Sequence, residues 1–347
     1  MTIRSTLARG IAAAMLLAAG ASTTLAADDF YKGKNLTMIV GYAPGGINDI
    51  AARLMGRYMV KYLPGSPSLV VQNMPAASGI SAINHMYNVA PKDGTTVSII
   101  GRGIPQLAFL GDPNIRFVPD KFTWLGSISS YADDAYPIFI MADRPVKTVE
   151  ELKEGRKKIV LGAVGPGSTN LAFALIAKDI LKLNIDVVRG YTGAAPLFLA
   201  MQSGEIDGQV VGFGSLKAGQ RSLWENKQVR ALVQFGRTTR HRDLPDAPTG
   251  QELAMNADDL TLIKFAEAPF YMALPFIAPP DIPADRAKLL RRAFEQSYKD
   301  KGFVAEAERL DLDVSPIDGD AVAKLVKEMA TASPQVLERF KTVSGLR

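Results

Sequence analysis

The stretch Ile39–Leu54, IVGYAPGGINDIAARL, joins an apolar run to a helical pattern through a proline–glycine–glycine turn. The residues before Pro44 are β-branched and apolar, which is typical of a buried strand. After Gly46 the apolar side chains recur at helical spacing, and Asn48 or Asp49 is expected to cap this helix. A helix N-terminus presents unpaired backbone N–H groups and favours an anion, and glycine lets a ligand approach them.

This turn lacks the common phosphate-binding motifs. A P-loop would need a lysine, and a dinucleotide-binding turn would need a third glycine at a fixed spacing; neither is present. The turn therefore offers neutral donors, which suit a carboxylate as well as a phosphate. A tight turn without any ligand would explain the glycines equally well.

Residues 1–26 have the pattern of a secretory signal. Arg4 and Arg9 form the basic start, IAAAMLLAAGA forms the apolar middle, and small residues precede a cleavage site near Ala27. The chain has no cysteine, which excludes disulfides, a thiol nucleophile and a lipidated N-terminal cysteine. We expect an exported, soluble periplasmic protein that is not lipid-anchored.

Length and charge narrow the class of protein further. The 347 residues suffice for two domains. The formal net charge is +5, and the signal contributes two of its positive charges. This charge is too mild and too dispersed to predict nucleic-acid binding, and it weakly favours small anions.

Strand-like and helix-like segments alternate along the chain, which favours parallel sheets flanked by helices. Two such runs in one exported chain predict a two-lobed α/β protein with a ligand cleft. The expected strands are 36–42, 68–74, 95–100, 137–142, 158–164, 185–191, 207–213 and 229–236. The expected helices are 47–62, 79–89, 149–154, 171–181, 195–203 and 216–226. A core-facing stripe of Ala287, Leu290, Phe294 and Tyr298 follows, and Ser333-Pro334 is expected to open the last helix.

Three more strand-to-helix turns resemble the first in composition. They are GAVGPGSTN at 162–170, VVQNMPAASGISA at 70–82 and RGYTGAAP at 189–196. Ser168, Thr169 and Asn170 can cap the helix that follows, or they can donate to an anion at its N-terminus. In open α/β sheets ligands bind at the carboxyl ends of strands, where such turns gather.

The sequence shows no catalytic or metal-binding pattern. The two histidines, His85 and His241, have no second ligand at metal-binding spacing, and a nucleophile elbow is absent. We therefore expect no metal, no cofactor and no enzymatic activity. A hydrolase using Asp133 and Asp134 is an unfavoured alternative, because no nucleophilic or basic partner is evident.

Taken together, the turns resemble the Bug-type (TctC-like) solute receptors of tripartite tricarboxylate transporters. The matching segments are FYKGKNLTMIVGYAPGGINDIAARL, LVVQNMPAASGISAINHMYNVAPKDGTTV, LGAVGPGSTNLAFAL, RGYTGAAPLFLAMQSGEIDGQVVGF, VRALVQFG and LPDAPTGQEL. The resemblance implies a periplasmic binding protein of the type II, Venus-flytrap kind that closes around a small di- or tricarboxylate or related acid. It also implies a monomer that delivers its ligand to one large and one small membrane subunit; a receptor that presents its ligand to a sensor remains an alternative.

The same resemblance identifies the expected ligand-binding residues. On the first lobe they are Tyr42, Pro44, Gly45, Gly46, Ile47, Asn48, Asn73 and Ser78, and on the second they are Ser168, Thr169, Asn170, Thr192, Gly193, Ala194 and Asp207. Ile47 and Asn48 stand where the family often has a glycine or threonine, and Asp207 could instead belong to a capped turn. The expected lobes are 27–133 plus 262–347, and 134–261. At their boundary Asp133 or Asp134 could face the ligand, although a solvated loop is the simpler interpretation.

Overall fold

The computed structural model describes residues 30–346 apart from 43, 156, 166, 167 and 192, and apart from the side chains of 78 and 218. The predicted signal peptide and its cleavage site lie outside these residues. The chain divides into two compact units. The first contains the described residues up to Ile100, with Lys121–Leu125 and Phe276–Val304, and the second contains Gly101–Asp120, Gly126–Pro275 and Ala305–Arg347. The lobe boundaries drawn from the sequence stay a prediction.

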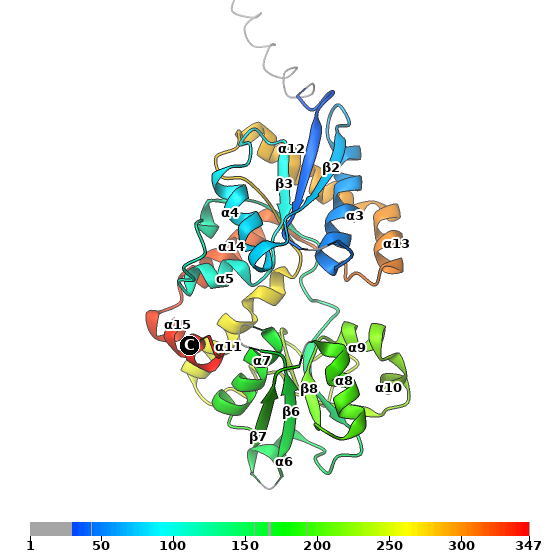
Figure 1. The fold of residues 1–347 in the computed structure, drawn as a ribbon, viewed down its shortest axis with the longest axis vertical. Coiled ribbons are helices and arrows are strands. Elements are labelled where there is room, and N and C mark those ends of the chain that lie inside the picture. The colour runs from blue at the N-terminus through cyan, green and yellow to red at the C-terminus, as the bar shows by residue number, and fades with distance from the viewer. Residues whose placement is uncertain (1–29, 43, 156, 166–167, 192, 347) are drawn as a thin grey trace, which may run out of the picture. The chain divides into compact units, whose positions relative to one another are not determined.

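A six-stranded sheet has the strand order β11-β4-β10-β3-β1-β2; Figure 1 labels β2 and β3 of this sheet. Val40 of β1 lies opposite Asn73 of β2 and Ile99 of β3 in parallel register. The carboxyl ends of these three strands therefore share one edge, where the turn after β1 begins. The strands are β1 (Asn35–Val40), β2 (Ser68–Asn73), β3 (Thr96–Ile99), β4 (Thr123–Ser127), β10 (Pro275–Ala278) and β11 (Ile317–Asp318).

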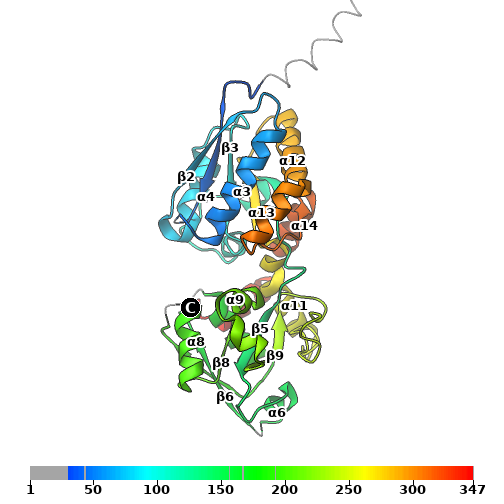
Figure 2. The ribbon, with the colours of Figure 1, turned by 90° about the vertical axis from the view of Figure 1, so that its right-hand side faces the viewer.

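Two long amphipathic helices of the first unit, α3 and α12, pack side by side (Figure 2). Within α12 the predicted stripe is partly confirmed as core, because Leu290 and Phe294 are fully buried while Ala287 and Tyr298 are half-buried. The helices associated with the first unit are α3 (Ile47–Tyr62), a 3₁₀ helix (Ala76–Gly79), α4 (Ile80–Asn88), α12 (Ala284–Lys299) and the start of α13 (Lys301–Arg309).

The second sheet has five strands in the order β7-β6-β8-β5-β9. β6 runs parallel to β7 and β8, but β5 runs antiparallel to both β8 and β9. The first sheet also contains antiparallel pairs, so both sheets are mixed, whereas the sequence suggested mainly parallel strands. A crossover connection joins consecutive strands that run parallel, but β5 lies between β8 and β9, neither of which follows it directly in the chain, so no such crossover sets its direction beside them. The strands are β5 (Tyr136–Met141), β6 (Ile159–Ala163), β7 (Ile185–Arg189), β8 (Gly208–Val210) and β9 (Val229–Phe235).

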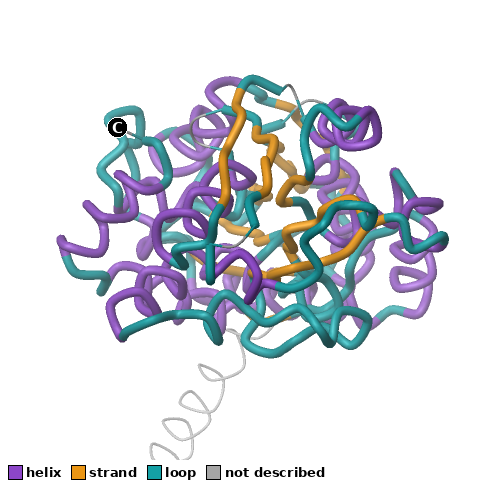
Figure 3. The backbone as a smooth tube through the Cα atoms, turned by 90° about the horizontal axis from the view of Figure 1, so that it is seen from below, coloured by secondary structure: helices purple, strands orange, loops and turns teal. Residues whose placement is uncertain are grey.

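Helices, purple in Figure 3, flank the strands, which are orange there. The predicted helix over 216–226 is wrong, because α9 ends at Gly219 and α10 begins at Arg221, and Gln220 between them leaves helical geometry with a φ of −142°. Glycine is a poor helix former, which explains the break. The helices are α5 (Ile104–Phe109), a 3₁₀ turn (Pro119–Lys121) at the unit boundary, α6 (Val149–Lys153), α7 (Thr169–Leu175), a π-helical turn (Ile176–Ile180), α8 (Ala194–Ser203), α9 (Phe213–Gly219), α10 (Arg221–Glu225), α11 (Ala257–Glu267), a 3₁₀ helix (Ala268–Met272), α14 (Gly319–Ala330) and α15 (Pro334–Val343).

Two further features bear on the expectations from sequence. Ser333 caps α15 by accepting the Val336 N–H at 3.3 Å, and Pro334 occupies the first helical position, which confirms the predicted start. Within the described residues, every helix is too short or too polar to cross a membrane.

Candidate functional site

The glycine turn after β1 leads directly into α3. The helix begins at Ile47, and its N-cap is Gly46, which has extended backbone angles and no side-chain hydrogen bond. The expectation that Asn48 or Asp49 caps the helix is therefore wrong. Asp49 lies in the first turn and reaches back, so that its Oδ2 accepts the Gly45 N–H at 2.9 Å. Gly45 has a φ of +87°, a left-handed conformation that favours glycine.

Asp49 is the centre of a small polar network that we call the Asp49 cluster: Gly45, Asp49, Arg53 and Asn73. Arg53 Nε donates to Asp49 Oδ2 at 2.9 Å, and Asn73 Nδ2 donates to Asp49 Oδ1 at 2.8 Å. Burial would raise the pKa of Asp49, but the hydrogen bonds from Arg53, Asn73 and Gly45 lower it to about 2. Asp49 is therefore ionised at neutral pH, and Arg53 offsets its charge.

Asn73, a predicted ligand contact, uses its side chain to hold the turn. Its Nδ2 donates to the Tyr42 carbonyl at 2.9 Å as well as to Asp49, and its Oδ1 accepts from Arg53 at 3.0 Å. An amide nitrogen has two protons, so both are committed. Asn73 therefore positions the turn rather than offering a spare donor to a ligand.

The turn after β1 also touches the next glycine-rich turn of the first unit. A Cβ on Gly41 would lie 2.8 Å from Cα of Gly79, and Gly79 itself has a φ of +93°. The two turns can approach this closely only as glycines. The structure thus brings Tyr42, Asn73 and the Ala76–Gly79 helix together, while the side chain of Ser78 lies outside what is described.

Backbone N–H donors remain available at the start of α3. Gly45, Gly46 and Ile47 are exposed and Asn48 is half-buried. No described residue accepts the N–H groups of Ile47 and Asn48, as is usual in a first helical turn. An anion at this end of the helix would meet backbone donors and the positive end of the helix dipole.

The second predicted turn combines a helix cap with an uncommitted hydroxyl. Ser168 Oγ accepts the Leu171 N–H at 3.2 Å and donates to the Gly165 carbonyl at 2.8 Å, so it caps α7. Asn170 is buried and ties Val164 to Val210 through its amide. Thr169 forms no hydroxyl hydrogen bond with any described residue. Of these three predicted ligand contacts, Thr169 has the donor that is most available.

The remaining predicted contacts of the second unit fall into two places. Gly193 is the N-cap of α8 and Ala194 is its exposed first residue, while Thr192 lies outside the described residues. Asp207 stands at the amino end of β8, where its Oδ2 accepts the Val160 N–H at 2.7 Å and its Oδ1 lies 3.0 Å from Arg144 Nε. Because β6 and β8 are parallel, this is the edge opposite the α7 turn. The structure therefore does not bring Asp207 to Ser168 and Thr169, and it favours the interpretation of Asp207 as part of a structural turn.

Ser168 and Thr169 line a pocket of about 120 Å³ within the second unit, which we call the Arg102 pocket. Arg102 precedes α5, and its guanidinium carbon lies 4.2 Å from the ring centre of Phe270 and 5.6 Å from that of Tyr131. The other walls come from α5, α7, α15 and the Ala268–Met272 helix. Sequence patterns do not single out Arg102, since a lone arginine after a strand belongs to no motif.

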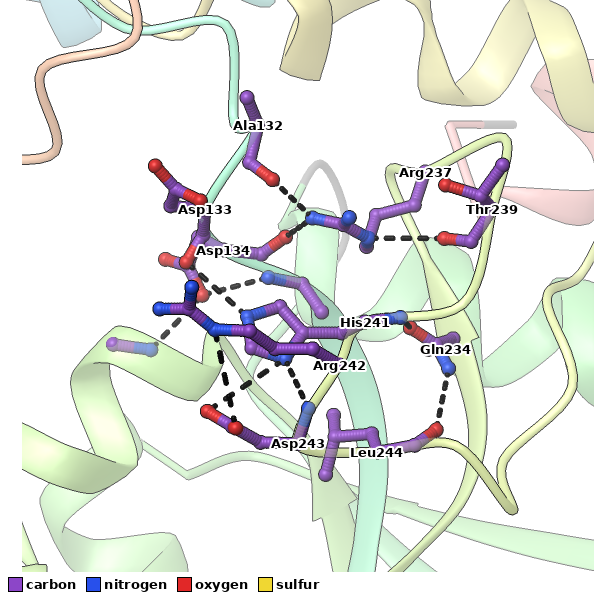
Figure 4. A network of polar contacts seen from close by, with 12 residues as sticks. Ala132, Asp133, Asp134, Gln234, Arg237, Thr239, His241, Arg242, Asp243 and Leu244 are labelled. Carbon is purple, nitrogen blue, oxygen red and sulfur yellow. Dashed lines mark hydrogen bonds and ion pairs between the residues drawn. The ribbon is translucent and has the colours of Figure 1, made fainter.

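The two loop aspartates, Asp133 and Asp134, lie in a network of polar contacts within the protein (Figure 4). Asp134 Oδ1 accepts the Gly214 N–H at 2.9 Å and the Ala135 N–H at 2.7 Å, which ties the loop to the start of α9. Burial raises the pKa of Asp134, although these N–H groups oppose the shift. Asp133 is exposed, as a solvated loop would have it.

Arg237 and His241, which follow β9 in the chain, contact the same loop. Arg237 Nη1 donates to the carbonyls of Ala132 and Asp134, each at 2.6 Å. His241 is buried, accepts the Asp243 N–H at Nδ1 and lies 3.3 Å from the Asp133 carbonyl through Nε2. Burial lowers the pKa of His241, so the imidazole is neutral and structural. Among the described residues there is also no cluster of three metal-ligating side chains.

A buried carboxylate elsewhere in the second unit predicts a pH-dependent stability. Glu267 is fully buried, and burial raises its pKa to about 7 despite hydrogen bonds from Gln251, Gly236 and Tyr271. Between pH 4.5 and 7 the native state then holds more protons than the unfolded state, so the free energy of unfolding falls as pH rises. We expect a loss of about 2 kcal/mol between pH 5 and pH 7 from this group.

Urea unfolding of Glu267→Gln across this range tests the prediction. The variant should lose this part of the slope, because glutamine does not titrate. Glu225→Gln is the matched control, since Glu225 is exposed and, among the described residues, pairs only with Arg221 one helical turn away. An unchanged slope in Glu267→Gln would show that Glu267 titrates normally.

Comparisons with known proteins agree with this fold. The family described as the tripartite tricarboxylate transporter family receptor, TctC, matches residues 52–341. A protein of the UPF0065 group from Cupriavidus necator is 23% identical over 341 residues, which cover 95% of each chain. A TctC solute-binding protein from Polaromonas superposes with a TM-score of 0.69 at 19% identity, covering 91% of this chain and 100% of that one. MatC from Rhodopseudomonas palustris, solved with bound malate, superposes with a TM-score of 0.57 at 20% identity, covering 90% of this chain and 99% of that one.

Two mixed sheets flanked by helices give the chain the α/β fold of the periplasmic binding proteins among the solved structures. The chain belongs to the TctC family of tripartite tricarboxylate transporter receptors. Receptors of this family are periplasmic and bind solutes, and they are not enzymes.

Proposed function

We propose that this protein captures a small organic carboxylate in the periplasm and delivers it to the large and small membrane subunits of a tripartite tricarboxylate transporter. The observation that carries the proposal is the start of α3. There the N–H groups of Ile47 and Asn48 have no acceptor among the described residues, and the Asp49 cluster fixes the turn that presents them. A carboxylate provides the matching charge and acceptor geometry.

The chemistry of relatives supports the ligand class. MatC, a structural neighbour, was solved with malate, a small carboxylate. Closure of two lobes around the ligand, a monomeric state and export through the N-terminal signal stay predictions. Presentation of the ligand to a periplasmic sensor is the alternative use of the same site, and neighbouring genes for the two membrane subunits would favour transport.

Ligand-induced stabilisation of the purified protein tests the proposal. A ligand present at about 100 times its dissociation constant should add about 2.7 kcal/mol, which is several degrees of melting temperature. The panel contains mono-, di- and tricarboxylates, amino acids, aromatic acids, sugars and simple cations. A shift with sugars or cations, and none with any acid, would contradict carboxylate binding.

A further inference from the structure

A second groove of the second unit lies beside α14 and shares no lining residue with the Arg102 pocket. It is lined by residues 130–132, which follow β4, by residues 236–239, which follow β9, and by Tyr271. The remaining wall is Ile317 and one face of α14, whose lining residues recur three or four positions apart: Ala321, Lys324, Leu325 and Glu328. We call it the α14 groove. Its volume of about 490 Å³ lies within the roughly 300–1,000 Å³ of small-molecule sites.

The Arg237 guanidinium in this groove has no acidic partner. Its Nη1 and Nε donate to backbone carbonyls, among them those of Ala132 at 2.6 Å and Thr239 at 3.0 Å (Figure 4). Its Nη2 forms no hydrogen bond with a described residue. Burial lowers the pKa of Arg237, and the charges of Asp133 and Asp134 oppose this shift without forming an ion pair with it. A half-buried guanidinium with free N–H groups favours an anion.

The other polar donors of the groove are uncommitted too. The hydroxyls of Ser130, Thr238 and Thr239 form no hydrogen bond with any described residue. The Lys324 ammonium lies 3.9 Å from the Glu328 carboxylate, which is too far for a hydrogen bond, and its side chain is 79% exposed. The described lining therefore offers two cations and three hydroxyls, against one carboxylate at the rim.

Part of the wall is apolar. Ile317, Ala321 and Leu325 contribute aliphatic side chains. Tyr271 contributes a half-buried ring, whose hydroxyl donates to Glu267 at 3.3 Å. A bare inorganic anion would fill little of the groove and leave this apolar surface in contact with water. An anion that carries an apolar group would use both parts of the wall.

From these observations we propose that the α14 groove binds a small phosphate monoester with an apolar group. A phosphate monoester carries roughly 1.5–2 negative charges at pH 7 and three acceptor oxygens, whereas a carboxylate has one charge and two oxygens. The phosphate pairs with Arg237 Nη2 and Lys324 and accepts the hydroxyls, and the apolar group lies against Ile317 and Leu325. This site is additional to the carboxylate site proposed at the start of α3 and does not depend on it.

Calorimetry near neutral pH with phenyl phosphate, benzoate and inorganic phosphate tests the site. Phenyl phosphate should bind roughly fivefold or more tightly than benzoate, which has the ring but a single charge, and than inorganic phosphate, which lacks the ring. Lys324→Gln should weaken phenyl phosphate binding roughly fivefold, because one of the two cations is lost. Glu328→Gln should strengthen it roughly twofold or more, because the repelling carboxylate is removed.

Lys327→Gln is the matched control, because Lys327 is an exposed lysine of α14 that does not line the groove. It should leave the affinity for phenyl phosphate unchanged, and so should Gly46→Asp at the start of α3. Lys324 and Glu328 are exposed, so both variants should fold, whereas Arg237 also holds the 132–134 loop and is a poorer choice.

Three results would overturn the inference. One is an affinity for phenyl phosphate that is the same in Lys324→Gln, Glu328→Gln and the parent. Another is benzoate binding as tight as phenyl phosphate binding in the parent. The third is loss of phenyl phosphate binding in Gly46→Asp, which would assign the probe to the start of α3. None of these results bears on carboxylate capture, which the panel of acids tests separately.

Discussion

Replacing Gly46 by aspartate should lower the affinity for the proposed carboxylate ligand at least tenfold and leave the fold intact. Gly46 has φ −80° and ψ 167°, which any residue adopts without strain, and aspartate is a favoured N-cap. Its carboxylate would accept the N–H groups of the first turn of α3 and repel an incoming anion. Losing one charge-assisted hydrogen bond costs roughly 1.5–3 kcal/mol, which corresponds to about a tenfold to hundredfold loss of affinity.

Gly46→Asn is the matched control, since asparagine has the size of aspartate and also caps helices but carries no charge. We expect an affinity between those of the parent and Gly46→Asp, whereas Gly46→Val should bind poorly through steric exclusion alone. Gly45 is unsuitable for this comparison, because its φ of +87° would strain any side chain. Calorimetry with the acid found in the screen, together with a melt of each variant, measures both effects. A folded Gly46→Asp protein with the parent's affinity would show that this turn is not the anion site.

The positions of the helices and strands were largely predictable from local patterns, but the pairing of the strands was not. The strands over 35–40 and 159–163 and the helix α3 follow from apolar periodicity and flanking glycines. Strand β11 has only two residues, and its pairing of Ile317 with Ser127 joins segments far apart in sequence. Such pairing depends on tertiary contacts rather than on local propensity, which also explains why the antiparallel position of β5 was missed.

For the candidate site, the sequence indicated the turns but not the side-chain contacts that keep them in position. Ser168 has the cap role that its position allowed. The spacing of Asp49 and Arg53, four residues apart on a helix, was a usable signal for an ion pair. Their common contact with Asn73 was not predictable, because Asn73 comes from another strand. Arg102 likewise acquires its surroundings from Phe270 and Thr169, which are distant in the chain.

Removing the Asp49 carboxylate should destabilise the protein and weaken ligand binding together. Asp49→Ala removes the acceptor of the Gly45 N–H and of Arg53 Nε, and one of the two acceptors of Asn73 Nδ2. The cost of breaking a buried ion pair is about 3–5 kcal/mol. Arg53 is 41% exposed and can turn to water, so we expect about 2–4 kcal/mol. Urea unfolding at pH 7 measures this loss.

The pH dependence identifies the carboxylate itself as the cause. Because the pKa of Asp49 falls from 3.8 to about 2 on folding, its ionised form stabilises the native state above pH 4. That stabilisation, about 2 kcal/mol, should disappear as pH falls from 4 to 2. Asp49→Asn keeps the shape and removes the titration, so its unfolding free energy should lack this part of the acid slope. If Asp49→Ala unfolds at the parent's urea concentration and binds ligand equally well, the Asp49 cluster does not hold the turn, and the N–H groups of α3 are positioned by the backbone alone.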